Sequence, residues 1–173
     1  MYTDSSSQTK QVFLSKQVEP LFKSTRSGGI GNIIAAILVY LILRDTSLSE
    51  SAAYITSAIT VTSIIRIVLS GQYLQCKNNL QKYLFSHLAL TFIIGTLWGM
   101  YAYIHLNTDD ETLRNQVLLI NFGLIAGSIA TLSTWMLSYL AYILPQSIAI
   151  FYIFVNSEAG YNIYVAIAFP IFV

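Results

Sequence analysis

The chain has 173 residues, of which 55% are hydrophobic and only 10% are charged. Soluble domains usually carry about 25% charged residues, so this composition excludes a water-soluble globule and makes a lipid bilayer the expected solvent. The net charge of +1 gives no electrostatic reason to expect nucleic acid or an acidic substrate, which leaves membrane lipids as the first expected partner.

The first 27 residues form a polar segment that we expect to lie in the cytoplasm or at the membrane surface. They lack the apolar core of a cleavable signal peptide, so we expect them to stay attached. Leu14, Val18, Leu21 and Phe22 recur at helical spacing, which suits a short helix on an anionic membrane face. Pro20 argues against that helix, because an interior proline costs about 3 kcal/mol. An interfacial helix and an irregular tether both remain open.

Residues 28–173 are predicted to form an all-α, polytopic transmembrane bundle of about six spans. The apolar segments are Gly28–Leu43, Ala52–Leu69, Tyr83–Leu106, Val117–Val155 and Tyr161–Val173. The fourth segment contains no Asp, Glu, Lys or Arg and would extend about 58 Å as a helix at ~1.5 Å per residue, enough for two passes through a core of about 30 Å. We expect its turn near Ser133, Thr134 and Ser138, with Trp135 at an interface.

The last segment, Tyr161–Val173, is too short to cross a bilayer and has no charged flank, so we expect the natural polypeptide to continue beyond Val173. Orientation follows from the basic residues of the short loops. Under the six-span prediction, all but two of the nine lysine and arginine residues fall on the side of the N-terminus. Arg66 is one of them, and its side chain is expected to reach the headgroups on that side. Both termini are therefore expected in the cytoplasm. The two on the opposite side are Arg44 and Arg114.

Small residues at GxxxG spacing occur twice, at Gly95 and Gly99 and again at Gly123 and Gly127. Such residues let helices approach closely in lipid, where dispersion replaces the hydrophobic effect. Packing inside one bundle is the preferred reading, because neighbouring spans of one chain need the same contacts. A homodimer interface is the alternative.

Polar and helix-breaking residues at membrane depth mark a candidate ligand or switch site. We predict it at Trp98, Asn121, Pro145 and Gln146, where Pro145 frees the carbonyl of residue 141 and a small apolar ligand could stack on the indole. Interhelical hydrogen bonding is the more ordinary role for Asn121 and Gln146. His87 is expected at an interface rather than as a titrating sensor.

Common catalytic and metal-binding motifs are absent from the sequence. The sequence has no HExxH, GxSxG or Walker loop, no cysteine and histidine cluster at metal spacing, and no acidic pair within a span. We therefore expect no enzymatic activity in these residues, no cofactor and no metal.

Several segments together resemble the N-terminal multi-pass membrane sensor regions of bacterial histidine kinases and GGDEF diguanylate cyclases. The segments that carry the likeness are Gln17-Val18, Leu21-Phe22, Ile64-Ile65-Arg66, Gly95-Thr96-Leu97-Trp98-Gly99, Gly123 through Ser133, Tyr139-Leu140-Ala141-Tyr142 and Leu144-Pro145. The resemblance implies a sensory input domain in the bacterial inner membrane that passes a signal to a cytoplasmic signalling module. A small transporter or channel subunit and a membrane scaffold are the alternatives.

Overall fold

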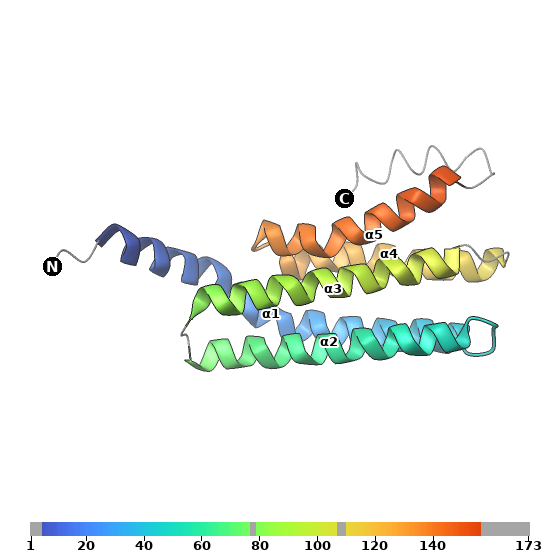
Figure 1. Cartoon of the computed structure of the whole chain (residues 1–173), viewed down its shortest axis with the longest axis horizontal. Helices are drawn as coiled ribbons and strands as arrows, with labels where there is room; N and C mark the ends of the chain where they lie inside the picture. Colours follow the sequence, from blue (N-terminus) through green and yellow to red (C-terminus); the bar gives the residue numbers. More distant parts are fainter. Residues whose placement is uncertain (1–4, 77–78, 107–109, 157–173) are drawn as a thin grey trace.

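The computed structural model describes residues 5–76, 79–106 and 110–156, and this part of the chain consists of helices joined by short turns. The helices follow one another as α1 (Ser5–Leu43), α2 (Ser49–Cys76), α3 (Leu80–Leu106), α4 (Glu111–Leu132) and α5 (Met136–Asn156) (Figure 1). The all-α class predicted from the sequence is confirmed for these residues.

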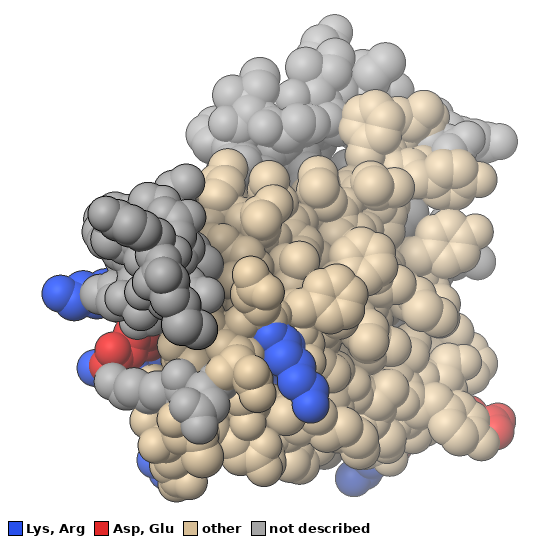
Figure 2. Space-filling model, turned by 60° about the vertical axis from the view of Figure 1, so that its left-hand side comes forward, with Lys and Arg blue, Asp and Glu red and all other residues tan. Residues whose placement is uncertain are grey.

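Four of the described helices are long and apolar enough to cross a membrane. The qualifying stretches are Val18–Leu43, Ser49–Cys76, Leu80–Ile104 and Asn115–Leu132, and a shorter apolar stretch, Met136–Tyr152, lies in α5. Large apolar side chains such as Phe85 and Leu119 are 72% exposed, and charged side chains occupy only small parts of the face shown in Figure 2. An apolar exterior of this extent requires lipid around it.

The first helix begins earlier than the sequence predicted. α1 passes through residues 27 and 28 without a break, so no element boundary separates the N-terminal segment from the first span. Residues 5–27 are helical, which excludes the irregular tether. Val18, Leu21 and Phe22 are buried against other helices rather than lying on a membrane surface, and the Phe22 and Tyr73 rings are 4.3 Å apart. This packing outweighs the cost of Pro20 within the helix. The side chain of Leu14 lies outside the described part.

Helix contacts define the arrangement of the bundle. α1 packs along α2, α2 packs along α3, and α3 makes its most extensive contact with α5, while α4 lies mainly against α1. In Figure 1, α1 and α2 run along the lower edge of the bundle, the more distant α4 lies behind α3, and α5 runs along the upper edge. The last two helices therefore attach to different partners.

The predicted turn within the long charge-free run is confirmed. α4 ends at Leu132 and α5 begins at Met136, with Trp135 in the turn between them. The Trp135 amide donates to the Leu132 carbonyl at 3.0 Å, which closes the turn. The predicted final segment, Tyr161–Val173, lies outside the described residues.

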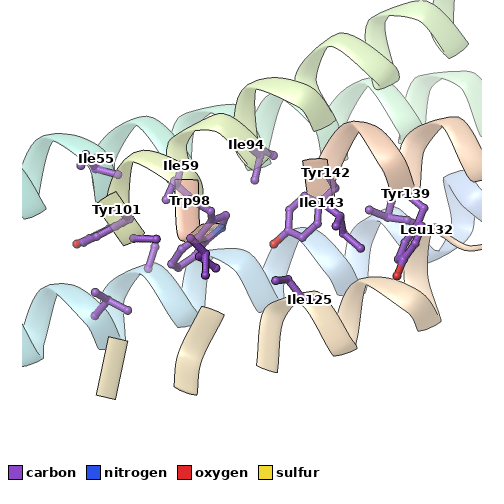
Figure 3. Packing of buried hydrophobic residues seen from close by; sticks show 14 of the residues in the cluster. Ile55, Ile59, Ile94, Trp98, Tyr101, Ile125, Leu132, Tyr139, Tyr142 and Ile143 are labelled. Atoms are coloured by element: carbon purple, nitrogen blue, oxygen red, sulfur yellow. The ribbon is translucent and has the colours of Figure 1, made fainter. Parts of the chain in front are cut away.

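The bundle interior combines aromatic rings with branched aliphatic side chains. Trp98 and Tyr101 stack with ring centroids 5.7 Å apart. Figure 3 shows them near Ile55 and Ile59, with Tyr142 of α5 further along the same interior. The hydroxyl of Tyr101 lies 3.0 Å from that of Thr56, so even this apolar interior pairs its polar atoms between helices.

Candidate functional site

Arg66 is a buried cation within α2. Its side chain is 2% exposed, and the helix continues to Cys76, about 15 Å further at ~1.5 Å per residue. Contrary to the prediction, the side chain turns into the bundle and does not extend outward along the helix surface. Nη1 donates to Thr91 Oγ1 at 3.3 Å, and Nε has no hydrogen-bond partner. The ion pairs found among the described residues are Lys23 with Glu19 and Arg44 with Asp45, so no carboxylate there pairs with Arg66.

His87 and three hydroxyl groups form a polar cluster beside Arg66. Thr25 and Thr91 donate their hydroxyl protons to backbone carbonyls, so each hydroxyl oxygen is left to accept a hydrogen bond from a neighbouring side chain. His87 Nε2 donates to Thr25 Oγ1 at 2.9 Å, because the Thr25 hydroxyl proton already goes to the Leu21 carbonyl. The hydroxyl oxygens of Ser138 and Thr91 lie 3.4 and 3.5 Å from Nδ1. His87 is 2% exposed, so the predicted interfacial placement is wrong.

A cavity of about 290 Å³ lies next to Arg66, mainly between α1 and α4. This volume is at the lower end of small-molecule pockets, which span about 300 to 1,000 Å³. Among the described residues that line the cavity, none is acidic and Arg66 is the one charged group. The lining residues from four helices are Ser27, Gly28, Gly31, Asn32, Arg66, Gly123, Leu124, Gly127, Ser128, Thr131, Leu132 and Tyr142.

Glycines create this cavity by leaving backbone bare on facing helices. A Cβ atom built at Gly31, Gly123 or Gly127 would have no heavy atom of another element within 4 Å. Gly123 and Gly127, expected to pack against a neighbouring helix, instead face open space on α4. α1 and α4 meet closely near Thr131: a Cβ added at Gly28 would lie 3.4 Å from Thr131 Cβ, and the Ser24 hydroxyl donates to the Thr131 carbonyl at 2.7 Å.

The other GxxxG pair does make a close helix contact. A Cβ built at Gly99 would stand 2.8 Å from the carbonyl oxygen of Pro145, and one built at Gly95 would collide with the backbone of Tyr142. Only glycine allows α3 and α5 to approach this closely. The contact lies within the bundle, as the sequence analysis preferred, and it involves the proline-containing stretch of α5.

Asn32 connects three helices at the edge of the cavity. Its Oδ1 accepts from Trp98 Nε1 of α3 at 2.8 Å and from the Tyr142 hydroxyl of α5 at 2.9 Å. Its Nδ2 donates to the Gly28 carbonyl of its own helix at 2.9 Å. The side chains of Asn32, Trp98 and Tyr142 are buried, and the two bonds to Oδ1 fix α3 and α5 relative to α1.

Asn32 was not predicted as a site residue, because the first span was expected to begin at Gly28. In the candidate span Val18–Leu43, Asn32 lies near the middle. Asn121 was selected as a polar side chain at membrane depth, and the same criterion selects Asn32 in this longer span.

The four predicted site residues do not form one cluster. Trp98 belongs to the Asn32 network, and Pro145 lies against Gly99. The amides of Asn121 and Gln146 donate to carbonyls one turn back in their own helices, rather than to the other helices as expected. Their buried side-chain oxygens have no hydrogen-bond partner.

A second hollow, of about 570 Å³, lies along α3 and α5 near Gly99, Tyr103 and Pro145. It has no charged lining residue, so nothing in it distinguishes a ligand from an acyl chain of the surrounding lipid. The Arg66 cavity is the better candidate, because a buried charge selects what enters.

Fold and site together define the class: an α-helical membrane protein with a partly open cavity beside a buried cation that has no ion-pair partner among the described residues. No family model, curated protein or solved structure matches the chain.

Proposed function

We propose that this chain is a membrane-embedded sensory input domain of a bacterial signal-transduction protein, acting on a cytoplasmic kinase or cyclase module. The observation that carries the proposal is the position of Asn32 and Tyr142. Both line the Arg66 cavity, and their hydrogen bond fixes α5 to α1. A ligand in the cavity therefore meets the groups that set helix positions.

In this proposal the ligand competes for the Asn32 amide and shifts α3 and α5 relative to α1. Packed interfaces convert small shifts into two discrete states. Interhelical hydrogen bonds in membranes are worth about 0.6 to 2 kcal/mol each, whereas moving an equilibrium from 1:99 to 99:1 takes about 5.5 kcal/mol. Losing both hydrogen bonds of Asn32 therefore supplies only part of the free energy needed to move the equilibrium. The ligand's contact with Arg66 supplies the remainder.

The proposal keeps the topology expected from the sequence: six spans in the inner membrane with both termini in the cytoplasm. Moving Arg66 into the bundle leaves more basic residues on the N-terminal side than on the other. Those remaining there are Lys10, Lys16, Lys23, Arg26, Lys77 and Lys82.

The test fuses the full chain through Val173 to a reporter diguanylate cyclase. Output is compared between wild type and the variants Trp98→Phe, Asn32→Leu, Pro145→Ala and Gln146→Leu. Thr62→Val is the control, because the Thr62 hydroxyl donates only to its own helix. We expect Asn32→Leu and Trp98→Phe to change output several-fold and the control to leave it unchanged. Equal output from all variants at equal protein levels would refute the switch.

One observation favours a second function, a small transporter or channel subunit. A buried charge in a membrane span often marks a substrate or ion pathway, and Arg66 is such a charge. Anion flux into vesicles containing the purified chain, lost in Arg66→Gln, would support transport in place of sensing.

A further inference from the structure

We propose that the cavity beside Arg66 binds an oxyanion, a carboxylate or phosphate group whose charge pairs with the guanidinium. The statement that this oxyanion is the ligand sensed by the domain rests on the proposed function. The binding itself requires no signalling output.

The charge of Arg66 needs a counter-ion that the described residues do not provide. Arginine stays protonated in proteins, so burial cannot remove the charge by deprotonation. Nη1 donates to Thr91, while among the described residues Nε has no acceptor and no carboxylate lies within ion-pairing distance. The planar guanidinium matches the two oxygens of a carboxylate or phosphate, and this geometry favours oxyanions over a spherical ion.

The cavity lining suits an anion of a few heavy atoms. No acidic side chain would repel it, and Gly31, Gly123 and Gly127 leave room for it next to the backbone. The hydroxyls of Ser27 and Ser128 donate to carbonyls of their own helices. A hydroxyl rotates freely enough to exchange such a bond for a stronger one to a charged oxygen.

The position of the cavity allows the oxyanion to come from water or from a lipid headgroup. Thr131 and Leu132 line it in the last turn of α4, where the chain turns into α5 next to Trp135. Tryptophan prefers the membrane interface, so the cavity reaches toward headgroup depth. A volume of about 290 Å³ accommodates a headgroup but not a whole lipid.

The first arm of the test uses the full chain in neutral maltoside micelles. Inorganic phosphate and octanoate are titrated, with chloride at equal ionic strength as the reference, and the melting temperature is followed by tryptophan fluorescence. The second arm measures binding of phosphatidylglycerol and phosphatidylcholine by native mass spectrometry. The first arm detects a soluble ligand, and the second detects an anionic lipid.

Two variants remove the site by different means, and each has a matched control. Arg66→Gln removes the charge, whereas Arg26→Gln removes an exposed charge of α1. Gly127→Leu adds a side chain to the cavity at a position where an added Cβ meets no atom within 4 Å, and Gly71→Leu places the same side chain at an equally open helical glycine outside the cavity. Charge-assisted hydrogen bonds predict an affinity loss of about tenfold or more in Arg66→Gln and Gly127→Leu, and less than about twofold in the controls.

Saturable binding of any one oxyanion probe, with this pattern across the variants, supports the proposal. The proposal is overturned if wild type responds to no oxyanion more than to chloride, or if Arg66→Gln and Gly127→Leu bind as wild type does. Binding that persists while the reporter fusion stays silent rejects the sensory function and leaves the site in place.

Discussion

Gly95 of α3 lies against the carbonyl oxygen of Ala141 in α5, so closely that a Cβ atom built on the glycine would stand 3.0 Å from that oxygen. Pro145 has no N–H to donate to this carbonyl, which would be its partner in an unbroken helix. The glycine pair of α3 and the proline of α5, two separate features of the sequence, therefore form one interface.

This relationship predicts unequal effects at the two GxxxG pairs. Gly95→Ala forces α3 and α5 apart and should lower the free energy of unfolding by about 1 to 3 kcal/mol, as overpacking does. Gly123→Ala meets no atoms and should change it by less than about 0.5 kcal/mol. Unfolding in mixed micelles with increasing dodecyl sulfate measures both. Equal losses would mean that α4 packs as closely as α3.

The Asn32 network predicts a larger loss on removing the acceptor than on removing one donor. Asn32→Leu leaves Trp98 and Tyr142 without their acceptor and should cost about 1 to 4 kcal/mol, counting about 0.6 to 2 kcal/mol for each interhelical bond. Tyr142→Phe removes one bond and should cost about half as much. The same unfolding experiment compares them, and an equal or smaller loss in Asn32→Leu would contradict the shared acceptor.

Arg66 is expected to destabilise the protein when no oxyanion is present. Arg66→Met replaces an unpaired buried charge with an apolar side chain of similar length and should raise the free energy of unfolding by about 1 to 4 kcal/mol. Arg44→Met removes an exposed cation paired with Asp45 at 3.3 Å and should change it by less than about 0.5 kcal/mol. Denaturation in a buffer containing only chloride checks this. A marked loss of stability in Arg66→Met would show that the charge has a structural partner.

The single cysteine provides a direct test of topology. Cys76 is exposed at the end of α2, on the side expected to face the cytoplasm. A membrane-impermeant maleimide should label it in inverted vesicles and leave it unlabelled in intact spheroplasts. In a Cys76→Ser background, Ser47→Cys in the exposed turn after α1 should give the opposite result. Labelling of Cys76 from outside would reverse the proposed orientation.

Composition and charge spacing were sufficient to predict the helical membrane fold and the turn after α4. The long run without charge had to be divided near Ser133, because a single helix of that length exceeds the bilayer. Helix boundaries that depend on packing against other helices were not predictable from composition and charge spacing. Val18 and Phe22 belong to the first span because of partners on α2, such as Tyr73, and local sequence does not reveal those partners.

The candidate site was predicted only in part for the same reason. Trp98 was predicted as a ring on which a ligand could stack, and the structure shows in addition that its indole N–H reaches an acceptor, Asn32, on a different helix. Arg66 falls near the end of an apolar run, where reaching toward water is the usual outcome. Its inward orientation depends on Thr91 and on the cavity between α1 and α4, which exist only in the assembled bundle.

The pairing of α3 with α5 rather than α4 also affects how the protein is made. During synthesis α3 enters the membrane before α5, so Gly95 and Gly99 face acyl chains until residues 141–145 arrive. Docking of α5 onto the face of α3 that carries Gly95 and Gly99 is then the last step of assembly for the described helices. A nascent chain halted at Leu132 would already contain Asn32, Trp98 and Arg66, yet it would lack the helix that closes the bundle around them.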